Sequence, residues 1–321
     1  MNVLVTGSGG QDGRLLIPLL VKSGYEVICA SKTEIYKVNP EGVTHKETNL
    51  GLDNKEFCNY ILNKFKPKII FHLAAVHGSR ESGSNFSQVN FQLMQRCHVQ
   101  ITANILDWMK RVKFNPKLIY PLTSQMYLAE EYPTVVDETK LPKPVNQYAK
   151  TKLEAWKLIQ EQRLITDVNV SCIILFTHTS IYAKNHFLLP SLANKLLTAL
   201  NTRVFKVNLI DALTPISLCS AEEVVFAMYQ LSKLDYPTDV LIGSSNLKTP
   251  TQIILEFVHM KSDLGISEIE ITSGTHVVQP YLSPITRKAQ RILDWNPQIN
   301  PVDILIDIFE NQKRSFTQSW N

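Results

Sequence analysis

Several features that would assign this chain to a specialised class are missing from its 321 residues. The cysteines form no C-x-x-C pair and lie far apart, at Cys29, Cys58, Cys97, Cys172 and Cys219. Their odd number and wide spacing argue against a disulfide framework or a zinc site and fit a reducing compartment. We therefore expect no metal ion and a cytoplasmic location.

Long apolar runs and blocks of one charge are also missing. No apolar run reaches the roughly 18 residues of a membrane span, and no basic leader precedes the opening apolar stretch MNVLVTG. The net charge is only +4, and the lysines and arginines are scattered. We therefore expect neither nucleic acid nor a membrane as a partner.

Short apolar strands alternate with helical patterns along the first 176 residues. The strands are predicted at 1–6, 25–30, 67–75, 116–124 and 168–176, and the helices at 12–24, 53–65, 85–112 and 146–166. This alternation predicts an α/β fold, a Rossmann-type doubly wound parallel sheet with helices on both faces. Pro18 should bend the first helix or force a local adjustment in it.

The alternation changes after residue 176. A helix at 221–233 and a strand at 239–244 are expected to return to the main sheet, and the other predicted elements are helices at 185–200, 249–264, 286–295 and 301–315 and a strand near 268–272. We predict an NAD(P)-binding Rossmann domain of residues 1–176 plus about 212–244. Residues 177–211 and 245–321 are predicted to form a smaller α/β substrate-binding lobe.

The first predicted strand runs into a glycine-rich turn, TGSGGQDG. Gly7 permits a tight turn, Gly10 lets the backbone approach a pyrophosphate, and Gly13 allows the next helix to pack closely on the strand. The N-terminus of that helix would face the phosphates with free N–H groups and its positive dipole end. A glycine motif between the strand and helix of a βαβ unit predicts dinucleotide binding.

Residues between the second strand and the helix at 53–65 are expected to contact the adenosine half of the dinucleotide. Ser31 and Lys32 follow the second strand, where an acid would bind the ribose of NAD and a basic residue the 2′-phosphate of NADP. Because no acid occurs before Glu34, the sequence favours NADP(H) over NAD(H). Asn49 and Leu50 should lie against the adenine ring.

Tyr148 and Lys152 lie four residues apart at the start of a predicted helix and therefore share one face of it. An ammonium group and a positively charged nicotinamide near Tyr148 would lower its pKa. Tyr148 would then transfer a proton at a sugar oxygen while hydride moves to or from the nicotinamide. Thr123 and Ser124 support this pattern because they end the preceding strand, where ligands bind in open α/β sheets.

Together these motifs resemble the extended short-chain dehydrogenases/reductases, specifically the nucleotide-sugar epimerase/dehydratase family and its GDP-mannose 4,6-dehydratases. The resemblance covers most of residues 1–180 and rests on VTGSGGQDG, FHLAA, TSQMY, YAKTK and ILFTHTS. It implies that Gln11 and Asp12 belong to the cofactor loop. It also implies that Leu73, Ala74 and Ala75 flank the nicotinamide and that ILFTHTS opens the sugar-nucleotide pocket.

The resemblance also implies catalytic roles. Thr123 would hydrogen-bond the sugar's 4-oxygen, Tyr148 would act as the base at that oxygen, and Lys152 would hold the ribose and tune Tyr148. In the dehydratases a glutamate that takes the C5 proton stands in the place of Gln125. An amide is neither a useful base nor a proton donor at neutral pH, so Gln125 can at most orient the substrate.

The substrate end of the site departs further from the family. Leu128 stands where a glycine is usual, Gln279 stands where an arginine would clamp the diphosphate, and the pocket segment lacks an arginine pair. A diphosphate needs cationic partners, and the candidates are Lys184, Lys195, Arg203 and Arg287. Ser124, His178, Lys184 and Arg287 are the predicted substrate contacts. His72 is expected to be a core residue, and no metal chemistry is assigned to His77, His178 or His186.

Three functions remain open from the sequence. The first is hydride transfer at C4 of a nucleoside-diphosphate sugar, GDP-linked, by a 4-keto reductase or epimerase. The second is a 4,6-dehydratase that takes its C5 base from Glu130 or Glu131, and the third is a non-catalytic regulator that binds the cofactor. The resemblance also implies a homodimer in which helices 85–112 and 146–166 of each subunit form a four-helix bundle.

Overall fold

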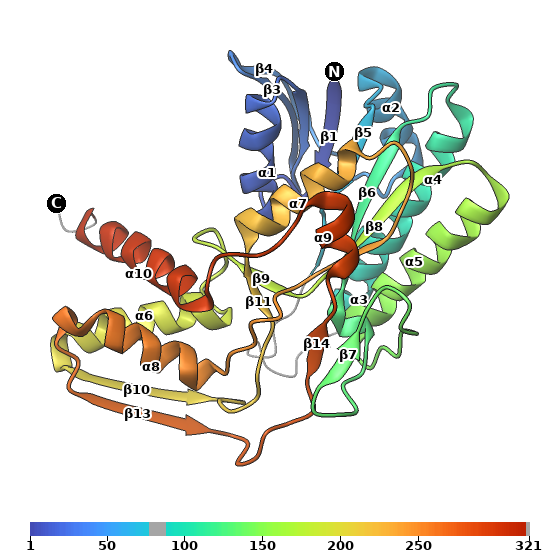
Figure 1. Ribbon diagram of the computed structural model, residues 1–321. Coiled ribbons are helices and arrows are strands. Elements are labelled where there is room, and N and C mark those ends of the chain that lie inside the picture. Colours follow the sequence, from blue (N-terminus) through green and yellow to red (C-terminus); the bar gives the residue numbers. More distant parts are fainter. Residues whose placement is uncertain (77–87, 319–321) are drawn as a thin grey trace.

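The protein is built around an eight-stranded sheet in the order β12-β8-β6-β5-β1-β2-β3-β4 (Figure 1). The computed structural model describes residues 1–76 and 88–318. Six strands run parallel: β1 (Asn2–Thr6), β2 (Glu26–Ala30), β5 (Ile69–His72), β6 (Lys117–Thr123), β8 (Asn169–Leu175) and β12 (Val240–Ile242). The predicted Rossmann-type α/β class is confirmed, including the return of the strand at 239–244 to the main sheet.

One edge of the sheet differs from the predicted all-parallel arrangement. β3 (Glu34–Asn39) and β4 (Gly42–Thr48) are antiparallel to their neighbours and extend the sheet beyond β2. Only residues 31–33 separate β2 from β3. A parallel crossover needs a dozen or more residues, so this short connection forces an antiparallel hairpin.

Helices cover both faces of the sheet and enclose two cores. α2 (Lys55–Phe65), α4 (Ile101–Arg111) and α5 (Gln147–Ile165) lie on one face, and α1 (Gln11–Lys22), α7 (Ala221–Lys233) and α9 (Arg287–Leu293) lie on the other. Alternate strand residues supply the two cores: Leu4 and Ile28 face the first, whereas Val3 and Val27 face the second. α1 continues through Pro18 without ending there.

The long helix predicted over 85–112 is interrupted. The structure places α3 at Gln88–Met94, a π-helical stretch at Gln95–Gln100 and α4 at Ile101–Arg111. The first three residues of the predicted helix, and His77, lie outside the described residues. A π-turn widens the helix by one residue and often marks a functional site.

A third core lies away from the main sheet, toward the C-terminus (Figure 1). It is enclosed by α6 (Leu188–Thr202), α8 (Pro250–Met260), α10 (Pro301–Gln318) and the parallel pair β10 (Val204–Leu209) and β13 (Glu268–Ser273). Two small parallel pairs lie between the cores. β9 (Thr177–Thr179) pairs with β11 (Leu218–Ser220), which supplies Leu218 to the third core, and β7 (Thr134–Val136) pairs with β14 (Leu282–Pro284) and packs on the first core. The residue bounds of the two domains stay a prediction.

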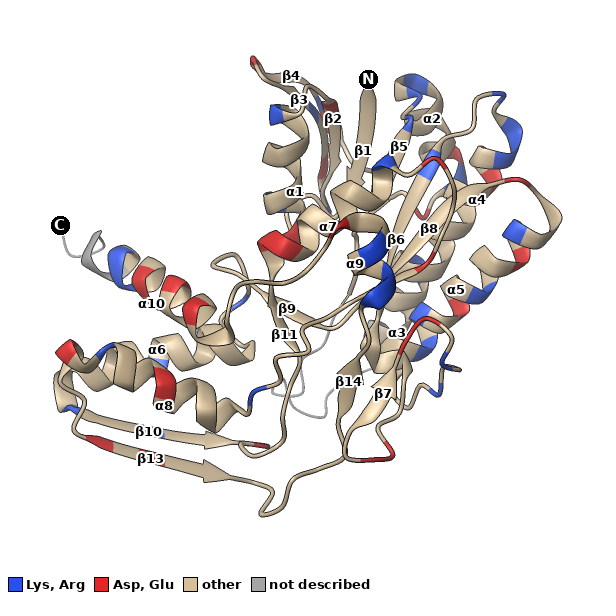
Figure 2. Ribbon diagram, viewed as in Figure 1, with Lys and Arg blue, Asp and Glu red and all other residues tan. Residues whose placement is uncertain are grey.

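The charged residues of both signs are interspersed over the helices, as Figure 2 shows for α2 and α5. Among the described residues no helix combines the length and the apolar character required to cross a membrane.

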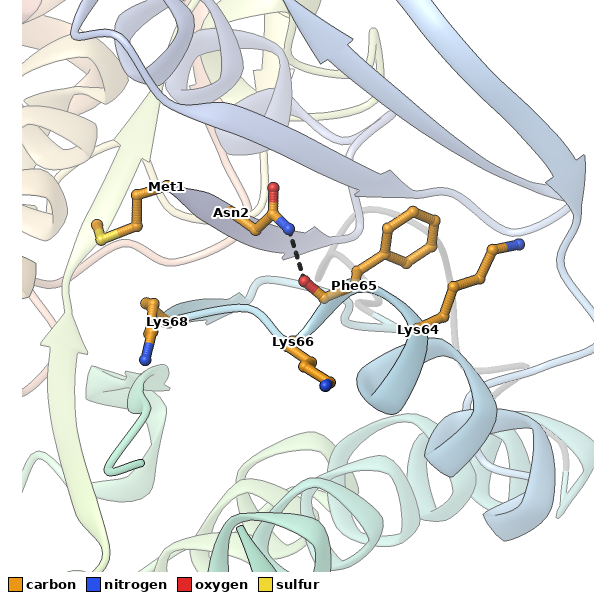
Figure 3. Close-up of a pocket in the computed structure, with 6 residues that line it drawn as sticks. All are labelled: Met1, Asn2, Lys64, Phe65, Lys66 and Lys68. Carbon is orange, nitrogen blue, oxygen red and sulfur yellow. Dashed lines mark hydrogen bonds between the residues drawn. The ribbon is translucent and has the colours of Figure 1, made fainter. Parts of the chain in front are cut away.

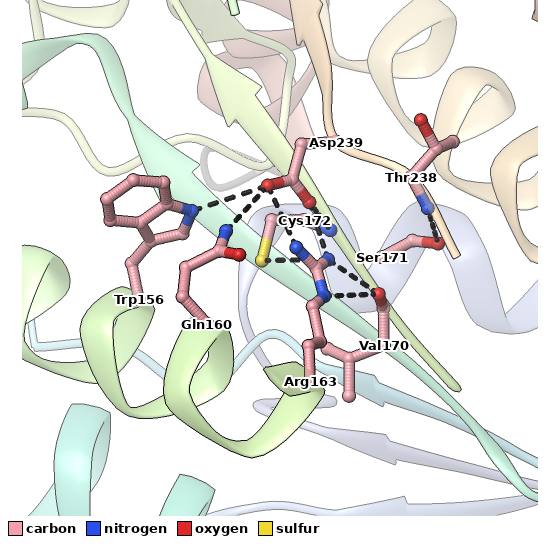
Figure 4. Close-up of polar contacts among 8 residues, drawn as sticks. All are labelled: Trp156, Gln160, Arg163, Val170, Ser171, Cys172, Thr238 and Asp239. Atoms are coloured by element: carbon pink, nitrogen blue, oxygen red, sulfur yellow. Dashed lines mark hydrogen bonds and ion pairs between the residues drawn. The ribbon is translucent and has the colours of Figure 1, made fainter. Parts of the chain in front are cut away.

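A partly buried ion pair fixes the C-terminal half of α5 to the sheet (Figure 4). The Asp239 carboxylate accepts hydrogen bonds from the Arg163 guanidinium at 2.6 and 3.1 Å, from Gln160 Nε2 at 3.1 Å and from the Cys172 backbone N–H at 2.9 Å. Arg163 also donates to the Val170 carbonyl on β8 at 2.6 Å. Burial opposes ionisation of Asp239, but Arg163 outweighs it and lowers the pKa of Asp239.

Asp239→Asn should lower the free energy of unfolding by about 2 kcal/mol at pH 7, because the partly buried charge of Arg163 loses its partner. Since the folded-state pKa of Asp239 lies below its unfolded value of about 3.9, its contribution is present above that pH. It is lost as the pH falls through the folded-state pKa. Urea unfolding between pH 3 and 7 measures both effects. Glu270→Gln, which breaks the exposed pair with Lys206, is the control and should change the free energy of unfolding far less than Asp239→Asn. Equal effects of the two variants at pH 7 would contradict this account.

Candidate active site

The predicted site residues gather at the edge of the sheet where the parallel strands end. Thr6, His72, Thr123 and Leu175 are the last residues of β1, β5, β6 and β8. A pocket of about 680 Å³ opens at the opposite edge, beside the start of β1, and is lined by Met1, Asn2, Lys64, Phe65, Lys66 and Lys68 (Figure 3). Ligands of open α/β sheets bind at the carboxyl ends of the strands, so we place the candidate site at the first edge.

The glycine turn after β1 is packed so tightly that side chains are excluded at two positions. A Cβ on Gly7, whose φ is +69°, would lie 2.7 Å from the Ala74 backbone nitrogen. A Cβ on Gly13 would lie 2.7 Å from the Gly7 carbonyl oxygen. The turn therefore presses against residues 73–75 on one side and lets α1 start directly beneath it on the other.

The N-terminus of α1 carries no side-chain cap. Gly10 is its N-cap residue, and the Gly10 N–H donates to the Gly7 carbonyl at 2.9 Å. The N–H groups of the first helical turn, at Gln11, Asp12 and Gly13, have no acceptor within the helix. This arrangement fits a bound phosphate, because free N–H groups and the positive end of the helix dipole point to the same place.

An ion pair neutralises the acidic residue in this first turn. His178 Nε2 lies 3.2 Å from both oxygens of Asp12, and His178 Nδ1 lies 3.0 Å from the Phe176 carbonyl. Burial opposes the charged form of both groups, but the attraction between them outweighs burial. The pKa of Asp12 is therefore lowered and the pKa of His178 is raised. An uncompensated carboxylate would repel a phosphate at this position, so His178 keeps the turn suited to an anion.

The segment that includes His178 is fixed to α1 by a second contact. The Arg14 guanidinium lies over the Tyr182 ring, 4.2 Å from its centroid. Two buried oxygens in this region, Gln11 Oε1 and Thr179 Oγ1, have no hydrogen-bond partner among the described residues. Unpaired buried oxygens are costly, so their position beside the glycine turn also fits a polar ligand there.

The residues predicted to contact adenosine occupy a hydrogen-bonded turn. Ser31 Oγ donates to the Glu34 carbonyl at 3.0 Å, and Asn49 Nδ2 donates to the Ser31 carbonyl at 2.5 Å. Lys32 is exposed at the tip of this turn, and Leu50 is 72% exposed beside it. The structure thus brings Ser31, Lys32, Asn49 and Leu50 together at the end of β2.

Tyr148, Lys152 and Thr123 meet at the ends of α5 and β6. Asn146 caps α5 by accepting a hydrogen bond from the Ala149 N–H at 2.8 Å, which sets where the helix begins. Lys152 is buried and donates from Nζ to the Pro121 carbonyl at 2.9 Å. The Tyr148 hydroxyl interacts with Thr123, the last residue of β6.

The pKa of Tyr148 shifts opposite to the expected direction. Burial and the charge of Asp12 raise the pKa of Tyr148, and the bond with Thr123 only partly offsets them. Lys152 does not lower it, because its ammonium is directed to the Pro121 carbonyl and burial lowers the pKa of Lys152 to about 8. In the protein alone, Tyr148 is therefore a protonated phenol.

Gln125 lies at the exposed rim of the site. Its Oε1 accepts a hydrogen bond from Asn146 Nδ2 at 3.0 Å, and its backbone N–H donates to Thr123 Oγ1 at 3.2 Å. Ser124, next to it, is half-buried. Gln125 is thus held between the end of β6 and the start of α5.

Other predicted residues lie in different surroundings. Glu130 is exposed and paired with Lys143 at 3.1 Å, and Glu131 is exposed. Lys184, Lys195 and Arg287 are exposed. Arg203 donates to the Leu264 carbonyl and so joins the end of α6 to the turn after α8.

The histidines separate into structural and site residues. His72 Nδ1 lies 2.7 Å from Thr6 Oγ1 and His72 Nε2 lies 3.2 Å from the Cys97 carbonyl, and burial lowers the pKa of His72 to about 3. It is a neutral core residue, as predicted. His98, which the sequence analysis did not select, is buried beside the Tyr148 ring. Within residues 1–76 and 88–318 no cluster of His, Cys, Asp and Glu could hold a metal ion.

A protein-family model and curated proteins are similar to this chain. The family model described as "NAD dependent epimerase/dehydratase family" matches residues 3–243. GDP-mannose 4,6 dehydratase of Drosophila melanogaster is 22% identical over 343 residues, which cover 96% of this chain and 85% of the relative. dTDP-4-dehydrorhamnose reductase of Aggregatibacter actinomycetemcomitans is 26% identical over 177 residues, 54% of this chain and 50% of the relative.

Solved structures share the fold over nearly the whole chain. UDP-glucose 4-epimerase of Thermotoga maritima, solved with UDP-glucose, has a TM-score of 0.79 at 16% identity and covers 98% of this chain and all of its own. RMD of Pseudomonas aeruginosa, complexed with NADPH, has a TM-score of 0.77 at 18% identity and covers 98% of this chain and 99% of its own.

Gly13→Ala should weaken binding of a nicotinamide dinucleotide about tenfold to a hundredfold, because the new methyl group displaces the glycine turn. Gly9→Ala is the matched control, since a Cβ on Gly9 meets nothing within 4 Å. Calorimetric titration with NADPH and NAD measures both. Equal affinities of the two variants would show that the turn does not hold the dinucleotide.

His178 should titrate above 6.5 in the folded protein, because Asp12 favours its charged form. Its pairing therefore contributes stability below the unfolded-state pKa of about 6.5, and this contribution is lost as the pH rises through the folded-state pKa. Asp12→Asn should lower the pKa of His178, since burial is then opposed only by the bond with the Phe176 carbonyl. NMR of the imidazole protons gives both values, and a pKa that is unchanged in the variant would refute the pairing.

Proposed function

This chain belongs to the NAD dependent epimerase/dehydratase family, and we propose that it is an NADP(H)-dependent enzyme that transfers hydride at C4 of a nucleoside-diphosphate sugar. The reaction we favour is reduction of a 4-keto sugar. The observation that carries the proposal is the meeting of Thr123, Tyr148 and Lys152 at the end of β6, with the amide of Gln125 in place of a carboxylate.

The glycine turn, the uncapped start of α1 and the neutralised Asp12 support dinucleotide binding. The cofactor would supply the hydride. Gly7, Gly10 and Gly13 would admit its pyrophosphate, and Leu73, Ala74 and Ala75 would flank its nicotinamide. Lys32, at the tip of the β2–β3 turn, favours the 2′-phosphate of NADP(H).

The protonation state of Tyr148 favours reduction. A phenol with a raised pKa can donate a proton to a carbonyl oxygen that gains negative charge when hydride reaches C4. Thr123 would hold the same oxygen, and solvent would restore the proton of Tyr148. Lys152, held by the Pro121 carbonyl beside Tyr148, would hold the ribose of the cofactor, as the family resemblance implies.

Two other functions, dehydration and non-catalytic regulation, fit the candidate site less well than reduction does. Dehydration has the likeness to GDP-mannose 4,6 dehydratase in its favour, but it requires a base at C5. Gln125 cannot supply one, and Glu130 is exposed and paired with Lys143. A non-catalytic regulator would bind the cofactor without turnover, and it would have no chemical need for a buried Lys152 beside Tyr148.

We propose a GDP-linked substrate and a homodimer on the family resemblance. Ser124, Lys184 and Arg287 would contact the substrate, with His178 acting through Asp12.

The outer face of α5 carries the exposed residues Lys150, Glu154, Lys157 and Glu161. A bundle formed by this face would therefore be held by charge pairs rather than by an apolar core.

A GDP-linked 4-keto-6-deoxy sugar should consume NADPH in equal amount and yield the reduced deoxy sugar. The loss of NADPH absorbance and the sugar recovered from the same reaction measure this. An epimerised sugar without loss of NADPH would favour epimerisation. Dehydration of GDP-mannose without added reductant would favour the dehydratase, and cofactor binding without turnover of either sugar would favour the regulator.

Tyr148→Phe should lower kcat about 100- to 10,000-fold by removing the proton donor, and the Kd for NADPH should stay within about twofold. Gln125→Ala should lower kcat less than about tenfold, because only an orienting hydrogen bond is lost. Steady-state kinetics and calorimetry measure both. An unchanged rate in Tyr148→Phe would exclude Tyr148 as the proton donor.

A further inference from the structure

A buried histidine bridges the two halves of the candidate site. His98 is fully buried, and it is the one buried residue of the π-helical stretch Gln95–Gln100. Its Nε2 accepts a hydrogen bond from the Val76 backbone N–H at 3.1 Å, and its Nδ1 lies 2.8 Å from Thr151 Oγ1. Val76 follows directly on the wall proposed to flank the nicotinamide, and Thr151 lies on α5 between Tyr148 and Lys152.

The donor and the acceptor in each of these hydrogen bonds follow from the chemistry of the backbone N–H of Val76. A backbone N–H can only donate, so His98 Nε2 is the acceptor and carries no proton. The proton of this neutral ring is therefore on Nδ1 and is donated to Thr151 Oγ1. Thr151 in turn donates its hydroxyl proton to the Tyr148 carbonyl at 2.9 Å. One chain of three hydrogen bonds thus connects the wall after β5 with the backbone of Tyr148.

His98 is itself held in place by its neighbours. The His98 carbonyl accepts hydrogen bonds from Thr102 Oγ1 at 2.6 Å and from the Tyr120 hydroxyl at 3.2 Å. The ring of His98 packs edge-on against the ring of Tyr148, with centroids 5.4 Å apart and an interplanar angle of 80°. The imidazole therefore constrains both the backbone and the ring of Tyr148.

We propose that His98 is a positioning residue that couples the nicotinamide wall to the proton donor Tyr148. The bond with Val76 fixes the wall, and the bond with Thr151 fixes the start of α5. The proposal rests on the function proposed above for Tyr148 and for residues 73–75. Because the two bonds leave from different ring nitrogens, each can be removed separately.

Two substitutions separate the bonds. The amide of His98→Gln reaches the position of Nε2, so it can still accept from Val76 but loses Thr151. The amide of His98→Asn reaches the position of Nδ1, so it can still donate to Thr151 but loses Val76. Thr102→Val is the control, since it removes a buried hydroxyl that bonds the same histidine's carbonyl and leaves both ring bonds intact.

The two variants are expected to change different quantities, the Kd for NADPH in one and kcat in the other. His98→Asn should raise the Kd for NADPH about tenfold and leave kcat within about twofold, whereas His98→Gln should leave the Kd within about twofold and lower kcat about tenfold. Hydrogen exchange should rise at residues 73–76 in His98→Asn and at residues 147–152 in His98→Gln. Thr102→Val should change the midpoint of thermal unfolding, but it should change neither the Kd and kcat nor the hydrogen exchange of these two segments.

A merely structural role gives a different result. It predicts that Kd, kcat and exchange change together in both variants, in proportion to the loss of thermal stability, and this outcome would overturn the proposal. If the wild-type protein turns over no sugar nucleotide, the proposed function fails. The Kd for NADPH and the exchange of the two segments then still decide whether His98 couples them.

Discussion

The placement of α5 along one face of the sheet, with its first turn at the carboxyl end of β6, is the constraint on which the candidate site depends. Its last turns are fixed by the partly buried pair of Arg163 and Asp239, and its first turn by the Asn146 cap. Lys152 joins the same helix to the Pro121 carbonyl of β6. A helix held at both ends keeps Tyr148 over the strand ends without relying on the loops around it, and a proton donor needs that precision.

The electrostatics of the site follow from burial as much as from charge. Asp12 occupies a position where a free carboxylate would oppose phosphate binding, and His178 balances it from a strand 166 residues away. The same negative charge and the same burial keep Tyr148 protonated. One ion pair therefore affects both the proposed anion site and the proposed proton donor.

The fold was largely predictable because its elements have strong periodicity. The strands that end in Thr6 and Thr123 and the helix that begins before Tyr148 were predicted within a few residues, since apolar spacing and glycine positions act locally. The antiparallel β3–β4 hairpin was not predicted as such, because a three-residue connection carries little pattern. The π-turn has no sequence signal at all. Its buried His98 is identified only by partners 22 and 53 residues away. The sign of the Tyr148 pKa shift likewise required knowledge of which group the Lys152 ammonium contacts.

The turn between β2 and β3 has a consequence for how this chain could diverge. Its shape is fixed by backbone groups and by Asn49, whereas the side chain of Lys32 takes no part in the bonds that hold Ser31 to Glu34 and Asn49. A single exchange of charge at its tip leaves the register of the neighbouring strands untouched. If Lys32 sets the preference between the two dinucleotides, as we propose, a change of one codon can alter that preference while the chemistry proposed for Tyr148 is inherited unchanged.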